Sequence, residues 1–283
     1  MTATLVPDMK GVRVFPPPPA GFDALAASKT DLARHGIPPC PDPRTQPEQA
    51  AQWQRLARRY RGFEHLAPQL ILADTPATPA TLEPGVAVLL SGLVHCGYSL
   101  TSEAPFTQLS ATWTVPNLNH TPGPHPGPVP FRTFFGLGFL DVHVEMTVDA
   151  AQNVTSVITI HTGAQVALPV RPGDAISALL CMNTNPAGTA AYFLANETTS
   201  QMVNFAIDTG FPPAHIINAG ISRDAPFPNP LARFGVVYFD EIVAFTTEGT
   251  RLLTDGGATR MVDTQGSTLA TPVRLYENAF KII

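Results

Sequence analysis

The chain has 283 residues, of which 44% are hydrophobic and only 14% are charged, with a net charge of -5. This length suffices for a large core, and the mild acidity excludes a protein that holds nucleic acid or an anionic membrane through a basic patch. The low charge, together with 30 prolines and 21 glycines, is typical of β-rich proteins and argues against long helical bundles.

The N-terminus lacks a charged segment followed by an apolar one, and no run of about 18 apolar residues occurs, so we expect a soluble protein that is cytoplasmic by default. Secretion stays open. Three cysteines, Cys40, Cys96 and Cys181, are too few and too widely spaced for a disulfide framework or a zinc site. The sequence predicts neither a metal nor another cofactor.

Residues 1–80 are predicted to form a Pro-rich arm, distinct from a domain over residues 81–283. The arm holds 13 of the 30 prolines and has nine Lys or Arg against seven Asp or Glu, whereas the remainder has eight against fifteen. Two short helices are expected in the arm. One starts at a capping box of Ser28 and Asp31, and the other at a box of Thr45 and Glu48.

From about residue 86 onward the pattern favours strands separated by turns. The expected strands cover residues 86–94, 107–115, 134–148, 154–161, 166–170, 175–182, 190–196, 202–207, 234–246, 259–263 and 269–275. Many short strands without intervening helices indicate an all-β fold, an antiparallel two-sheet sandwich.

The clearest single pattern lies in residues 141–149, where polar and apolar residues alternate without a break. Period two predicts a strand with one buried face. Asp141, His143 and Glu145 then share the other face, with neighbours roughly 7 Å apart. This row is either a solvated surface or the floor of a binding or catalytic site.

The order of several short motifs resembles that of the eqolisins, or glutamic peptidases. The matching segments are residues 109–116, 135–138, 144–149, 171–176, 196–198, 234–239, 257–263 and 267–270. The resemblance covers roughly residues 86–283 and implies a concanavalin-like β-sandwich, a jelly roll. It also implies an acid-acting endopeptidase that uses a Gln and a Glu on one sheet, with the Glu as general base toward water.

Both catalytic positions of the family differ here. Glu145 occupies the Gln position, and Arg223 or Asp224 occupies the Glu position, depending on a one-residue gap. An ionised carboxylate cannot donate a hydrogen bond as an amide does. If Arg223 faces the site, we expect it to form an ion pair with Glu145.

Two functions from different classes remain open. The first is a peptidase whose catalytic pair is rebuilt from Glu145 and Asp224, two carboxylates that share a proton. The second is a non-catalytic module that binds an extended peptide, polypeptide or glycan through Asp141, His143, Glu145, Thr159 and His161. A metal site of Asp141, His143 and His161 matches no ligand signature, so solvated side chains are the stronger interpretation.

The arm also has alternatives. The resemblance allows a removable, electrostatically docked prosegment. We prefer an arm that packs permanently over one sheet or one mouth of the cleft through Trp53, Leu56, Tyr60 and Phe63. The third alternative is an exchange arm that joins copies of the chain into a homo-oligomer.

Overall fold

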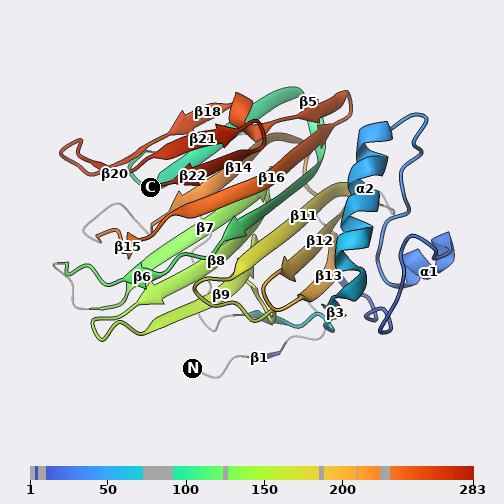
Figure 1. The fold of residues 1–283 in the computed structure, drawn as a ribbon, viewed down its shortest axis with the longest axis horizontal. Coiled ribbons are helices and arrows are strands. Elements are labelled where there is room, and N and C mark those ends of the chain that lie inside the picture. Colours follow the sequence, from blue (N-terminus) through green and yellow to red (C-terminus); the bar gives the residue numbers. More distant parts are fainter. Residues whose placement is uncertain are drawn as a thin grey trace.

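The computed structural model describes residues 4–5, 11–72, 92–123, 127–184, 188–208, 210–223 and 230–283. Within these ranges the chain is mostly antiparallel β-sheet, with two α-helices near the N-terminus (Figure 1). The predicted all-β sandwich with a partly helical N-terminal arm is therefore confirmed.

The fold is organised around β5 (His95–Thr114), a strand of 20 residues that belongs to both layers. Its first half lies between two strands of the first layer, and its second half lies between two strands of the second layer. The first layer follows the order β18 (Gly257–Thr259), β5, β14 (Ala214–Ser222), β7 (Val129–Leu137), β8 (Leu140–Val148), β9 (Val154–Ile160), β10 (Gln165–Val166), β4 (Leu70–Leu72) and β1 (Thr4–Leu5).

The second layer continues from the other half of β5. Its strands are β21 (Pro272–Tyr276), β22 (Ala279–Ile282), β17 (Gly249–Arg251), β16 (Val237–Thr246), β5, β11 (Ala175–Thr184), β12 (Thr189–Asn196), β13 (Gln201–Asp208), β2 (Val12–Val14) and β3 (Glu64–His65). Two small ladders pair β6 (Leu118–Asn119) with β15 (Arg233–Phe234), and β19 (Met261–Val262) with β20 (Thr268–Ala270).

The core lies between the two layers and is centred on Trp113. Its ring stacks on Phe135 at 5.7 Å and on Phe239 at 6.3 Å between centroids. Its Nε1 donates a hydrogen bond of 2.9 Å to Oγ1 of Thr133 in β7, so the polar edge of the indole is satisfied across the layers.

Several predicted strand boundaries are wrong. Residues 134–148 form a hairpin of two strands, because Gly138 adopts a φ of +62° in a tight turn with Phe139. The prediction missed β14, as well as the first half of β5. The strand expected at 86–94 falls mainly on residues outside the described part of the chain, and residues 92–94 form a turn.

The arm contains α1 (Lys29–Arg34), α2 (Pro47–Arg59) and a 3-10 turn, η1 (Tyr60–Gly62). A second 3-10 turn, η2 (Leu253–Asp255), lies near the C-terminus. Ser28 caps α1 as predicted, since its Oγ accepts from the Asp31 amide at 3.1 Å. The second capping box is wrong: α2 begins at Pro47, and its N-cap residue Gln46 makes no side-chain cap. Proline at the first helical position suffices because that N–H is unpaired anyway.

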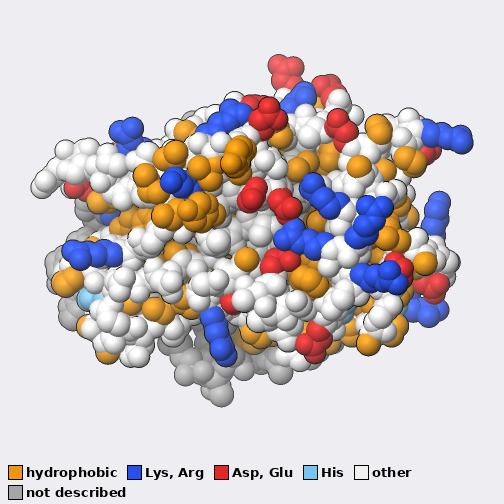
Figure 2. Space-filling view, viewed as in Figure 1, with side chains coloured by type: hydrophobic (Ala, Val, Ile, Leu, Met, Phe, Trp, Pro, Cys, Tyr) orange, Lys and Arg blue, Asp and Glu red, His pale blue; other side chains and the backbone are white. Residues whose placement is uncertain are grey.

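Helix α2 lies across the strands of the second layer, beside the ends of β11, β12 and β13 in Figure 1. Gln52 donates to Ser110 of β5 at 3.0 Å, and the Tyr60 hydroxyl contacts Ser177 of β11 at 2.8 Å. Arg59 contacts both Glu197, at 3.0 Å, and Glu241. Acidic and basic side chains accordingly lie close together beside α2 in Figure 2.

Candidate functional site

Four strands of the first layer bring a row of polar side chains together on the face that points away from the core. In register across β5, β14, β7 and β8, the row is His95, Ser222, Arg132 and Glu145. The adjacent row on the same face contains Phe134 and His143, which are also direct partners. We call this surface, with Asp141 and Thr159, the site face.

The alternation predicted for residues 141–149 is confirmed in β8. Val142, Val144, Met146 and Val148 are at most 1% exposed, whereas the residues between them are partly exposed. The strand therefore directs Asp141, His143 and Glu145 to the site face together.

Glycines keep the centre of the site face shallow. Gly97 and Gly220 are direct partners in β5 and β14. A Cβ atom at either position would collide with the backbone of the other strand. The His95 ring of β5 contacts the Phe134 ring of β7 edge-on, at 5.5 Å between centroids, and β14 lies between these two strands.

Glu145 forms an ion pair with Arg132, with 3.2 Å between Oε1 and Nε. The side chains are 33% and 28% exposed, so this pair is accessible to a ligand. A guanidinium carries five N–H donors, whereas an ionised carboxylate only accepts. The pair thus presents a base and hydrogen-bond donors side by side.

The ion pair with Arg223 that the sequence suggested is replaced by this one. Arg132 and Glu145 lie directly opposite each other in β7 and β8, whereas Arg223 follows the end of β14. The Arg223 side chain is buried, and its Nε donates to the carbonyl oxygen of Leu93 at 2.9 Å. Burial lowers the pKa of Arg223, although nearby Asp263 opposes that shift. Asp224 lies outside the described residues.

Asp141 and Thr159 carry buried oxygen atoms that have no hydrogen-bond partner among the described residues. Thr159 lies opposite His143 in β9 and is only 3% exposed. The Asp141 carboxylate is 3.7 Å from Nε2 of His143, too long for a hydrogen bond. The predicted residues Asp141, His143 and Thr159 therefore lie together, but without satisfying one another.

His161 is directed elsewhere. It lies in the turn after β9, and its Nδ1 is 2.9 Å from the hydroxyl of Tyr192 in the second layer. The two rings stack at 6.2 Å, and Phe211 meets the imidazole edge-on. Burial lowers the pKa of His161, and the nearby Asp141 only partly offsets this. We therefore assign His161 a role in joining the layers.

His95 is the most strongly shifted titratable group on the site face. Burial lowers its pKa from 6.5 to about 4, and His143 and Arg132 add further repulsion of a positive charge. Its Nδ1 is buried with no hydrogen-bond partner within the described ranges. The imidazole is consequently neutral in mild acid.

We expect this histidine to make folding pH-dependent. The unfolded chain binds the proton first, so stability falls as the pH drops from about 6.5 to about 4, by up to about 3 kcal/mol. Urea denaturation of wild type and His95→Gln at pH 7 and pH 4 measures this, with the exposed His215→Gln as control. An acid-induced loss of the same size in both His95→Gln and wild type would contradict the prediction.

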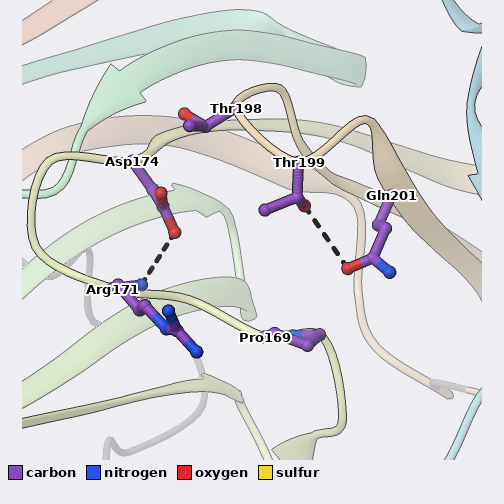
Figure 3. Close-up of a pocket in the computed structure, with 6 residues that line it drawn as sticks. All are labelled: Pro169, Arg171, Asp174, Thr198, Thr199 and Gln201. Carbon is purple, nitrogen blue, oxygen red and sulfur yellow. Dashed lines mark hydrogen bonds between the residues drawn. The ribbon is translucent and has the colours of Figure 1, made fainter.

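A pocket of about 460 Å³ lies away from the site face, between two turns (Figure 3). It is lined by Pro169, Arg171, Asp174, Thr198, Thr199 and Gln201. The Asp174 carboxylate accepts from the Arg171 amide and from the Asn196 side chain, both at 2.8 Å. Asp174 thus serves the turn, as its Pro-Gly-Asp context predicts.

Nowhere in the described part of the chain do three His, Cys, Asp or Glu side chains lie close enough to hold a metal ion. Asp141, His143 and His161, for which a metal site was the weaker interpretation, do not form such a group. No helix among the described residues is both long and apolar enough to cross a membrane.

Comparison with known proteins gives a family and a fold. Residues 94–282 match the model of the peptidase A4 family. Scytalido-glutamic peptidase, solved with a peptide-based transition-state analogue, superposes with a TM-score of 0.52 at 14% identity, over 67% of this chain and 97% of that one. SCP-B, an eqolisin solved with the tripeptide Ala-Ile-His, gives 0.50 at 13% identity, over 67% and 96%. A comparison with curated protein sequences finds no match.

Proposed function

Because the chain belongs to the peptidase A4 family, the eqolisins, we propose that it hydrolyses peptide bonds on the site face, with Glu145 as the general base. The observation that carries this proposal is the accessible ion pair of Glu145 and Arg132. The solved relatives hold a peptide-based analogue and a tripeptide, which supports an extended peptide as the ligand.

The pair can supply the general base that the resemblance assigns to the Glu, together with hydrogen-bond donors such as the amide of the Gln provides. The Glu145 carboxylate accepts a proton from a water molecule as the water oxygen attacks the peptide carbonyl carbon. The Arg132 guanidinium donates hydrogen bonds to the carbonyl oxygen, where negative charge develops. The proton then passes to the leaving nitrogen as the C–N bond breaks. Since an ionised carboxylate cannot donate, Arg132 compensates for the amide that Glu145 replaces.

Asp224 remains the second candidate carboxylate, on sequence alone. A dyad of Glu145 and Asp224 would share one proton and work in acid. Neutral His95 is compatible with an acidic working range, because it adds no positive charge beside Arg132 until the pH approaches about 4.

One observation favours a second function. An ion pair neutralises both of its members, so the site face could hold an extended peptide without cleaving it.

The deciding experiment incubates the protein with a fluorescent, unstructured polypeptide from pH 3 to pH 7. Mass spectrometry detects new termini, and fluorescence anisotropy measures binding. We expect cleavage that scales with protein concentration and is absent after denaturation. Saturable binding without new termini at any pH would instead support the binding module.

We further propose that the arm is a permanent part of the fold rather than a removable prosegment or an exchange arm. The support is that α2 and η1 contact β5, β11 and β16, and that strands of the arm extend both layers. The site face belongs to the first layer, whereas α2 lies on the second.

Replacement of Arg59 tests how firmly the arm is held. Because its guanidinium contacts two carboxylates and is about one-third exposed, Arg59→Ala should lower the free energy of unfolding by about 1 kcal/mol. The nearby exposed Arg58→Ala is the matched control. Limited proteolysis of the arm at neutral pH should accelerate in the Arg59 variant only. Equal rates in the two variants would mean that the contacts of Arg59 with Glu197 and Glu241 do not hold the arm.

A further inference from the structure

We infer that the site face contains a subsite for a cationic side chain, built around Asp141, and that the substrates are therefore peptides carrying lysine or arginine near the cleaved bond. The statement about substrates rests on the proposed peptidase function. The binding part of it stands without catalysis.

One oxygen of the Asp141 carboxylate has no hydrogen-bond partner in the described part of the chain. Asp141 has a 35% exposed side chain, so a ligand can reach it, yet its Oδ1 is buried without a hydrogen-bond partner among the described residues. Its Oδ2 lies 3.7 Å from Nε2 of His143, which is too long for a hydrogen bond. Buried acceptors in proteins are normally paired, so an unpaired carboxylate on an accessible face calls for a donor from outside.

A second oxygen atom without a donor lies on the next strand, β9. Thr159, diagonal to Asp141 across β8 and β9, is 3% exposed, and its Oγ1 also has no partner in the described structure. Two neighbouring strands thus present oxygen atoms without donors at one place. Lysine carries three N–H donors and arginine five, all with positive charge, and such charge-assisted bonds are stronger than neutral ones.

The basic side chains near Asp141 already have partners within the protein. Arg132 pairs with Glu145, and the imidazole of His161 is bound to the Tyr192 hydroxyl. Burial also lowers the pKa of His161, which disfavours its charged form, although nearby Asp141 partly opposes this shift. His143 is the remaining group, and it shares Asp141 only at the long distance given above. A substrate cation would therefore not have to displace an existing ion pair.

The position of the subsite limits where the charged residue can lie. Asp141 and Glu145 are four residues apart on one face of β8, which is roughly 13 Å at the rise of an antiparallel strand. An extended peptide covers that distance in about four residues. We therefore place the lysine or arginine within four residues of the bond that Glu145 attacks.

The test uses N-acetylated fluorescent peptides with one lysine placed at each position from four residues before to four residues after a cleaved bond. Each peptide has a matched partner in which that lysine is Nε-acetylated and so uncharged. We measure kcat/KM by product quantification and affinity by anisotropy. At one position we expect wild type to bind the charged peptide about tenfold more tightly than its acetylated partner, whether or not kcat/KM also differs.

Variants assign the preference to its residues. Asp141→Asn should abolish it, and Thr159→Val, which keeps the shape, should reduce it a few-fold. Asp141→Lys should reverse the preference toward a glutamate-containing peptide. Asp240→Asn, an exposed carboxylate on the outward face of the second layer, is the matched control and should keep it. Circular dichroism melting confirms that each variant is folded.

Three outcomes overturn the inference. One is equal affinity of wild type for the charged and acetylated peptides at every position. Another is a preference that survives Asp141→Asn. The third is an equal gain when a lysine-free version of the same peptide, added to the set, has a free N-terminus in place of its acetyl group, which would assign the subsite to an α-amine. Cleavage without any lysine preference refutes the subsite alone, whereas lysine-dependent binding without cleavage refutes the peptidase alone.

Discussion

Glu145→Gln should lower kcat for peptide cleavage by about 10²- to 10⁴-fold, the range typical for loss of a general base. The amide keeps the size of the carboxylate but cannot take a proton from water between pH 3 and pH 7. Binding should change little, so KM should stay within a few-fold of wild type. Steady-state kinetics with one fluorescent peptide, from pH 3 to pH 7, measures both quantities.

The control for this experiment is Glu103→Gln, an exposed carboxylate of β5 outside the site face. The opposite result would also be informative, because Glu145→Gln restores the residue that the eqolisin resemblance implies. If the variant cleaves as fast as wild type or faster, the base is a different group. Asp224→Asn would then be expected to abolish the activity, and Glu145 would be reassigned to holding Arg132.

The second large effect concerns stability. Trp113→Ala is expected to lower the free energy of unfolding by about 3–5 kcal/mol, because it empties the centre of the sandwich. Trp113 is 1% exposed and stacks between Phe135 and Phe239. The change also leaves the buried hydroxyl of Thr133 without its donor, which adds to the cost.

Urea denaturation followed by circular dichroism measures this loss, since the chain has two tryptophans and fluorescence would mix their signals. Tyr238→Ala is the matched control, because that aromatic residue is 46% exposed on β16, next to Phe239. It should change stability by no more than about 0.5 kcal/mol. A similar loss in both variants would mean that Trp113 is not the centre of the core.

The sequence predicts the sandwich and the outward face of β8 well. The alternation of polar and apolar residues in β8 depends only on which side chains this strand buries against the core. The position of Arg132 opposite Glu145 could also be predicted from the sequence. With Gly138 and Phe139 as a two-residue turn, pairing back along the hairpin brings Arg132 opposite Glu145. The prediction of one continuous strand over residues 134–148 concealed this partner.

Other members of the site face depend on contacts that local patterns do not contain. His95 and Ser222 become neighbours only because β14 inserts between β5 and β7, more than 80 residues away along the chain. The segment of β14 contains Asn, Ala and Gly in succession, and these residues are poor strand formers, so its tertiary pairing contributes to its structure. His161 illustrates the converse, because the turn after β9 directs it to Tyr192 rather than to the site face.

The shared strand β5 has a consequence for how the molecule comes apart. His95 of the site face lies at one end of this strand, and Ser110, which binds α2, lies in its other half. Neither layer can separate from the rest without breaking the ladder of the strand that both contain. The layers and the helix across them therefore form one cooperative unit, and heating should melt them in a single calorimetric transition.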